Sequence, residues 1–183
     1  MVVEDATGSA RRAELLDAAY AYALEHGLAD LSLRPLAAAI GSSPRVLLYL
    51  FGSKDGLLRE LLGRARTDEL DGIRAVGGVG GEGEAGTVEA VWVWLAAPEH
   101  RTLLVLWTEA YARSLVEPDG PWSGFARDTV RDWLDLLDPR GTSATATTSL
   151  AVLRGAFLDL LATGDADRVG GAVSSYAAAL RAS

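Results

Sequence analysis

The chain has 183 residues, no cysteine and a formal net charge of −8 at pH 7, and 49% of its residues are hydrophobic. This composition permits a globular core, and the lack of cysteine excludes a disulfide framework and thiolate chemistry. The acidic excess lies in residues 67–183, which hold 17 Asp/Glu and 9 Lys/Arg, whereas residues 1–66 hold 8 of each. The neutral first third can still bind an anionic polymer if its cations line one face.

No signal peptide and no apolar run long enough for a membrane helix is found, so we predict a cytoplasmic protein without a membrane partner. Residues 1–8 are predicted to be a disordered tail, and the first helix is expected from about Ser9 to His26, ending at Gly27. Arg11 and Arg12 lie near its start. They either contact nucleic-acid phosphate or the minor groove, or are ordinary solvated charges.

Two short helices joined by a tight turn are predicted after this helix. Ser32 is the expected N-cap of the first, with Pro35 in its opening turn, and Gly41 ends it. Ser43 and Pro44 provide a capping hydroxyl and a fixed φ at the start of the second, which runs from Pro44 to Phe51. Such a pair is typical of the helix-turn-helix unit, whose second helix enters the DNA major groove.

The second of these helices is expected to have two different faces. Leu47, Leu50 and Phe51 share one, and Arg45, Leu48 and Tyr49 lie on the other. We interpret Arg45 as the candidate for reading a base, because a guanidinium can pair bidentately with guanine. The predicted set of DNA-binding residues is Arg34, Ser43, Pro44, Arg45, Tyr49 and Lys54.

The rest of the chain also has the spacing of helices. Helices are predicted from Lys54 to about Val76 and over residues 87–97, 99–116, 122–137, 142–163 and 165–180, with a flexible glycine-rich loop at 77–86. No alternating strand pattern occurs. The predicted fold class is therefore all-α, with a DNA-binding domain over residues 9–53 and a second helical domain over 54–183.

Aromatic residues gather in one stretch of about forty residues. They either form ordinary core or line a cavity between helices together with a few polar groups. The candidate ligand-binding residues are Trp92, Leu104, Trp107, Tyr111, Trp122, Phe125, Thr129 and Trp133.

Catalytic and metal-binding patterns are not found in the sequence. His26 follows Glu25 and His100 follows Glu99, but adjacent side chains on a helix point about 100° apart and do not converge on a metal. Motifs for a nucleophilic serine or a zinc site are also missing. We therefore predict no enzymatic activity, no metal and no cofactor.

Many residues in the first third resemble the tetracycline-repressor (TetR) family. The residues that carry this resemblance are Leu15–Ala19, Gly27, Ser32–Arg34, Leu36, Ala37, Ala39, Gly41, Ser43, Leu47, Phe51, Ser53–Asp55 and Leu57. The resemblance implies an all-helical dimeric repressor with a small-molecule site in its C-terminal domain. The chain departs from the usual pattern at Ala23, Arg45 and Leu48, which bears on the operator sequence more than on the fold.

The last two predicted helices combine apolar faces with small residues. Such faces either pack within one chain or pair with their copies around a two-fold axis, and the resemblance implies the second arrangement. The candidate dimer residues are Leu153, Ala156, Phe157, Leu160, Val169, Val173 and Tyr176.

The sequence thus predicts a dimeric transcription regulator that binds a pseudo-palindromic operator and is released by a small apolar or amphipathic effector. Repression rather than activation is implied by the resemblance. One alternative is a helical small-molecule-binding protein with lost or weak DNA binding, which Leu48 and the acidic balance favour. A second alternative is an enzyme within a helical bundle, for which no catalytic residues are found.

Overall fold

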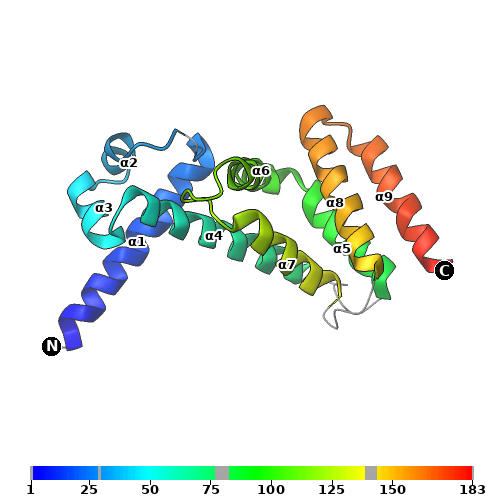
Figure 1. Cartoon of the computed structure of the whole chain (residues 1–183), viewed down its shortest axis with the longest axis horizontal. Helices are drawn as coiled ribbons and strands as arrows, with labels where there is room; N and C mark the ends of the chain where they lie inside the picture. The colour runs from blue at the N-terminus through cyan, green and yellow to red at the C-terminus, as the bar shows by residue number, and fades with distance from the viewer. Residues whose placement is uncertain (1, 29, 77–82, 139–143, 183) are drawn as a thin grey trace. The chain divides into compact units, whose positions relative to one another are not determined.

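The computed structural model describes residues 2–28, 30–76, 83–138 and 144–182, and every regular element in these ranges is helical. Figure 1 shows their order along the chain. The helices are α1 (Val2–His26), α2 (Leu33–Ala39), α3 (Pro44–Phe51), α4 (Lys54–Ala75), α5 (Gly83–Ala96), α6 (Arg101–Val116), α7 (Phe125–Leu137), α8 (Ala144–Thr163) and α9 (Ala166–Arg181), with a short 3-10 turn at Pro98–His100. The predicted all-α fold class is confirmed.

The chain divides into two compact units. The first comprises Met1–Arg66 and Leu106–Ala126, and the second comprises Thr67–Val105 and Arg127–Ser183. This division does not follow the boundary at residue 53 expected from the sequence. One helix, α6, contributes its beginning to the second unit and its later turns to the first.

The first unit is built around apolar faces of α1, α3 and the start of α4. Its buried core is formed by Leu15, Ala19, Ala23, Leu36, Leu47, Phe51, Leu57 and Leu61. A side chain from α6 also joins this unit, because the Glu109 carboxylate accepts a hydrogen bond from the Leu28 backbone amide at 3.0 Å. The loop after α1 is therefore held by α6, where Gly27 turns the chain with a φ of +79°.

The second unit is centred on α5, α8 and α9, which pack against one another. Its core contains Val88, Val91, Trp92, Leu95, Trp133, Leu153, Phe157, Val169 and Val173. Ser149 on α8 and Tyr176 on α9 are joined by a 2.9 Å hydrogen bond between their hydroxyl groups. Gly72 on α4 leaves room for Trp94, whose ring lies where a Cβ at this position would sit.

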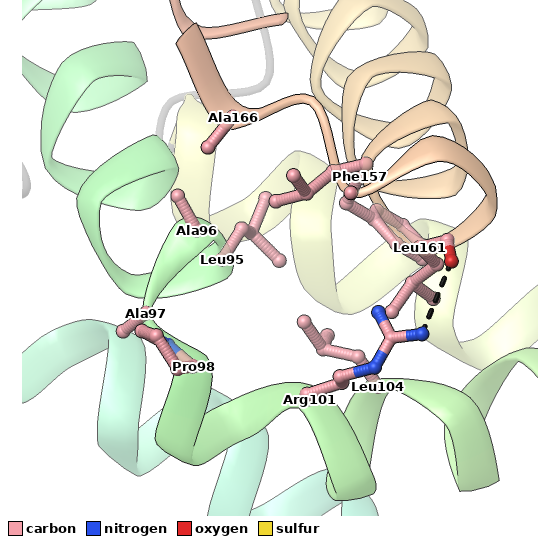
Figure 2. A pocket seen from close by; sticks show the side chains of 11 residues that line it. Leu95, Ala96, Ala97, Pro98, Arg101, Leu104, Phe157, Leu161 and Ala166 are labelled. Atoms are coloured by element: carbon pink, nitrogen blue, oxygen red, sulfur yellow. Dashed lines mark hydrogen bonds between the residues drawn. The ribbon is translucent and has the colours of Figure 1, made fainter.

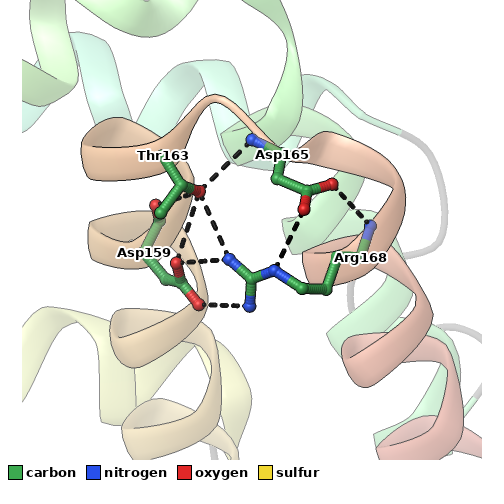
Figure 3. Close-up of polar contacts among 4 residues, drawn as sticks. All are labelled: Asp159, Thr163, Asp165 and Arg168. Atoms are coloured by element: carbon green, nitrogen blue, oxygen red, sulfur yellow. Dashed lines mark hydrogen bonds and ion pairs between the residues drawn. The ribbon is translucent and has the colours of Figure 1, made fainter.

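An ionic cluster closes the turn between α8 and α9 (Figure 3). Arg168 binds Asp159 at 2.7 Å and Asp165 at 3.1 Å, and Asp165 also caps α9 by accepting a hydrogen bond from the Arg168 amide. The hydrogen bond from Arg168 lowers the pKa of Asp159 below its ordinary value of 3.8. Because these side chains are solvent-exposed, the cluster fixes the geometry of the hairpin more than its stability.

Several boundaries differ from those expected. Helix α1 begins at Val2 rather than near Ser9. Helix α5 begins at Gly83, inside the predicted glycine loop, because Ala85 and Gly86 are buried in the core. Residues 77–82 of that loop lie outside the described residues.

Further differences concern caps and helix starts. The side chain of Ser32 makes no capping hydrogen bond, although Ser32 occupies the N-cap position. Trp122 precedes α7 instead of starting it, and α8 begins at Ala144.

Helix α8 is also more apolar than the sequence reading allowed. Its length and composition would suffice to cross a membrane, yet only 28% of its most apolar window is buried in the chain. Length and composition alone are weak evidence for a membrane helix. The exposed apolar face therefore requires another explanation, which the proposed dimer provides below.

Candidate nucleic-acid interface and ligand cavity

Helix α3 is short and is defined at both ends by local interactions. The Ser43 hydroxyl accepts a hydrogen bond from the Val46 amide at 3.3 Å, and Pro44 occupies the first helical position. Gly52 ends the helix with a φ of +76°, and Ser53 caps α4 by accepting from the Gly56 amide at 2.9 Å. The Ser43 cap confirms the helix start predicted there, and α4 begins at Lys54 as predicted.

The two faces of α3 differ as predicted. Leu47 and Phe51 are buried, whereas Arg45, Leu48 and Tyr49 are exposed. Tyr49 is 86% exposed, an unusual position for a large aromatic side chain. Arg45 and Tyr49 are four residues apart and therefore lie on the same side of the helix. This side of α3 is available to a partner. The neighbouring Val46 is 39% exposed, although the sequence analysis did not place it on the exposed face.

An open depression of about 590 Å³ lies next to α3. It brings together three of the predicted DNA-binding residues, Arg34, Pro44 and Lys54. Its remaining lining comes from Ser32, Leu33 and Pro35. Two exposed cations on the rim of a depression at the start of a capped helix are suited to an anionic group such as a phosphate.

Arg12 has a structural role that neither reading of the sequence foresaw. Its guanidinium donates to the Glu60 carboxylate at 2.6 Å and lies 5.1 Å from the ring centre of Phe51. It therefore joins α1, α3 and α4 within the first unit. Arg11 pairs with Glu14 on its own helix at 3.1 Å.

The eight candidate ligand residues are divided between the two units. Trp107, Tyr111, Trp122 and Phe125 lie in the first, and Trp92, Leu104, Thr129 and Trp133 in the second. Trp107 stacks on Tyr111 with 4.9 Å between ring centres, and it meets the Phe125 ring edge-on at 6.2 Å. Seven of the eight are buried, and Tyr111 is partly buried.

A cavity of about 200 Å³ lies in the second unit, between the end of α5, the start of α6 and the turn from α8 to α9. Figure 2 shows its lining, which is apolar except for Arg101. The lining residues are Leu95, Ala96, Ala97, Pro98, Arg101, Leu104, Phe157, Leu160, Leu161, Gly164 and Ala166. Leu104 is the one candidate ligand residue among them.

The candidate dimer residues occupy two environments. Leu153, Phe157, Val169 and Val173 are buried inside the single chain, where they pack in the core of the second unit. Ala156, Leu160 and Tyr176 are partly buried. The exposed side of α8 instead carries Ala144, Thr148, Ala151, Gly155, Leu158 and Ala162, which recur every three or four residues.

The histidines are placed as structural residues. His26 stacks on Tyr22, and His100 stacks on Trp94 with 4.1 Å between ring centres. The Nδ1 of His100 lies 2.7 Å from the Trp94 carbonyl oxygen. Within the described ranges no three His, Asp or Glu side chains come together as a metal site would require.

The N-terminal segment of the chain is similar to a known protein family. Residues 15–61 match the family described as bacterial regulatory proteins, tetR family. The resemblance to the TetR family is confirmed. No curated protein sequence matches the chain.

Solved structures extend the TetR likeness to most of the chain. The multidrug binding protein EbrR, complexed with imidazole, has a TM-score of 0.71 and 26% identity, covering 90% of this chain and 88% of that one. The same protein complexed with proflavin has a TM-score of 0.68 and 26% identity, covering 90% and 98%. A TetR-like transcriptional regulator from Rhodococcus sp. RHA1 has a TM-score of 0.61 and 20% identity, covering 91% and 93%. The fold is that of TetR-type DNA-binding transcriptional regulators.

Some residues of this TetR-type fold were missed by sequence reasoning. Glu69 is 1% exposed although it is charged. A signal for it existed, because Leu62, Ala65, Glu69 and Ile73 recur at helical spacing along the buried side of α4. No comparable signal existed for Arg101, whose hydrogen bond reaches a residue 60 positions away.

Proposed function

We propose that the chain is a ligand-responsive repressor that binds a pseudo-palindromic operator as a homodimer and releases it when a small apolar or amphipathic effector binds. The observation that carries the proposal is the exposed side of α3, with Arg45 and Tyr49 pointing to solvent from a capped helix in a helix-turn-helix segment. A cytoplasmic location accompanies this function, because the operator is chromosomal or plasmid DNA.

The DNA contacts divide into two kinds. Arg45 reads a base in the major groove, because its guanidinium can pair with guanine through two hydrogen bonds. The other predicted residues lie along the DNA backbone: Arg34, Ser43, Pro44, Tyr49 and Lys54. The cations and hydroxyls among them bind DNA phosphates, which fixes the register of α3 on the duplex without reading the base sequence.

The dimer explains the apolar outer side of α8. Small residues there allow close approach of a second helix, and Leu158, which is 40% exposed, gives it a larger apolar contact. On α9 the exposed residues Gly171, Ser175 and Ala178 are also small. An isologous pairing of both helices with their copies forms a four-helix interface, for which we expect a buried area above about 1,000 Å² in total.

A small-molecule effector is supported by the likeness to EbrR, which is described as a multidrug binding protein. The effector site of this chain lies in its second unit, which contains the apolar cavity. The predicted set of ligand residues stays a prediction. Its members Trp92, Leu104, Thr129 and Trp133 lie in that unit, and Leu104 lines the cavity.

The test is selection of bound duplexes from random DNA, followed by binding measurements on the selected site. Arg45→Ala is expected to weaken the selected site by about 1–3 kcal/mol and to relax specificity at one position in each half-site. Lys54→Ala is expected to weaken all duplexes alike and to reduce the salt dependence. Arg127→Ala is the matched control, because it removes one exposed positive charge from the other unit.

A second candidate function is a helical small-molecule-binding protein with weak DNA binding. The observation in its favour is Leu48, an exposed leucine on α3 where TetR-like proteins usually carry a tyrosine. If the selection enriches no duplex, and Arg45→Ala leaves the weak binding to random duplexes unchanged, the repressor proposal is refuted and this alternative is favoured.

A further inference from the structure

The cavity beside Arg101 has the chemistry of a site for a small amphipathic anion. We propose that it binds a monocarboxylate with a phenyl-sized apolar body, the carboxylate on Arg101 and the body among Leu95, Leu104 and Phe157. The inference deepens the proposed function by naming the effector class, and only its effect on DNA rests on that function.

The apolar part of the site determines the size of the ligand. An apolar cavity of about 150 Å³ is enough to hold a benzene molecule, so the space of about 200 Å³ in this chain admits one ring with a short linker. The walls come from four helices, α5, α6, α8 and the start of α9. Leu161 lines the α8 side (Figure 2), and Leu160 also belongs to the lining. A drug-sized molecule would not fit without movement of these walls.

Arg101 determines the charge of the ligand. Its Nη2 donates to the Leu161 backbone carbonyl at 3.2 Å, which holds the guanidinium beside the cavity (Figure 2). A guanidinium has five N–H donors, and across the described residues Arg101 has no carboxylate partner. Arg101 stands in the first turn of α6, where a cation gains nothing from the dipole of that helix, and its hydrogen bond to Leu161 leaves N–H donors for a ligand.

Two carboxylates of the adjacent hairpin are engaged by another arginine. Asp159 and Asp165, at the end of α8 and the start of α9, are both bound by Arg168 (Figure 3). The positive charge of Arg168 compensates them locally. On the cavity side a ligand carboxylate therefore meets a guanidinium that has no carboxylate partner among the described residues.

The proposed dimer leaves this side of α8 uncovered. At 3.6 residues per turn, the cavity residues Phe157, Leu160 and Leu161 lie about 140° around the helix from Gly155, Leu158 and Ala162. The partner helices would pack on the second set. The cavity and the dimer interface therefore use different sides of the same helix.

The experiment is calorimetric titration of the full chain with three probes that share a phenyl ring and differ in the charge of their polar group. Phenylacetate carries the carboxylate, 2-phenylethanol is neutral and 2-phenylethylamine is a cation. We expect phenylacetate to bind at least about tenfold more tightly than either of the others. Equal affinity for all three, or preference for the amine, would overturn the inference.

Variants locate the binding. Arg101→Met keeps the apolar stem and is expected to weaken phenylacetate at least about tenfold while leaving 2-phenylethanol within about twofold. Arg127→Met, an exposed arginine on α7, is the matched control and should leave both affinities unchanged. Ala96→Leu fills the cavity without altering charge and should weaken both probes. Phenylacetate binding unaffected by Arg101→Met and Ala96→Leu would place the ligand elsewhere and refute the site.

The effect on DNA is measured separately, on the selected operator. Phenylacetate that binds through Arg101 and lowers operator affinity supports both proposals. Phenylacetate that binds through Arg101 without changing operator affinity leaves the site intact and overturns its role as effector site. Operator binding without any phenylacetate binding overturns this inference and leaves the repressor proposal standing.

Discussion

Replacement of Arg12 by methionine should cost stability and leave DNA recognition intact. Arg12 lies near the start of a TetR-type DNA-binding segment, where basic residues commonly contact the minor groove or phosphates. In this chain its guanidinium is instead engaged with Glu60 and lies over Phe51. Methionine keeps a similar apolar stem, so the substitution removes the charge and its two interactions.

The size of the loss follows from the two contacts. The ion pair with Glu60 involves side chains that are 39% and 40% exposed, and partly exposed pairs are worth about 0.2–1 kcal/mol. The position over the Phe51 ring adds about 0.5–1 kcal/mol. We therefore expect a decrease of about 1–2 kcal/mol in the free energy of unfolding, which corresponds to about 2–8 °C in Tm for a chain of this size.

Two measurements together separate a structural role from a DNA contact. Thermal and urea unfolding give the loss of stability, and a double-mutant cycle with Glu60→Gln gives the energy of the ion pair. Operator binding at several salt concentrations gives the number of phosphate contacts, because each one contributes about −0.9 to the slope of log K against log salt. The structural role predicts an unchanged slope.

The opposite pattern would show that Arg12 contacts DNA. A shallower salt slope in Arg12→Met, with unchanged Tm, would mean that Arg12 leaves Glu60 when DNA is present and contacts phosphate. A cycle with no coupling energy between Arg12 and Glu60 would remove the ion-pair contribution and leave only the contact with Phe51.

Other substitutions test separate parts of the chain. Leu158→Glu should convert the dimer to a folded monomer in sedimentation, whereas Val173→Glu, which places a charge at a position 1% exposed, should cost about 3 kcal/mol or more in the free energy of unfolding. Glu109→Gln weakens the acceptor for the amide that follows α1 and should cost about 1–2 kcal/mol while lowering amide protection from hydrogen exchange there. The lowered pKa of Asp159 means that its ionised form contributes stability above an ordinary pKa of 3.8, and this contribution is lost as the pH falls further through the folded-state pKa. Asp159→Asn should therefore flatten the decline of stability in acid, as measured by thermal unfolding across that pH range, and an unchanged acid profile would exclude the pairing with Arg168.

The fold was predictable because its signals are local. Ser43, Pro44 and Gly52 act within a single turn of backbone, and the apolar spacing of each helix is set by its own sequence. Ser32 shows where such signals fail, because the residue stands at the N-cap without making the side-chain hydrogen bond that its identity suggests. Gly83 shows a second failure, since burial of the following residues outweighs the low helix propensity of glycine.

The contacts that build the candidate sites were not predictable from one sequence. Arg12 meets a residue 48 positions away, Arg101 one 60 positions away and Leu28 one 81 positions away. Each of these pairings depends on how the helices pack against one another, which the local spacing of residues in the sequence does not indicate. The candidate dimer residues illustrate the same point, because the sequence identifies an apolar stripe but not whether α5 or a second chain covers it.

The turn after α1 is constrained twice at one residue. Gly27 takes a φ of +79°, which side chains rarely adopt, and a Cβ at this position would come within 3.4 Å of the Glu109 carboxylate. The same carboxylate holds the Leu28 amide at 3.0 Å. Any larger residue at position 27 would therefore strain the backbone and press on the group that anchors the next residue, so this turn favours glycine for two independent reasons.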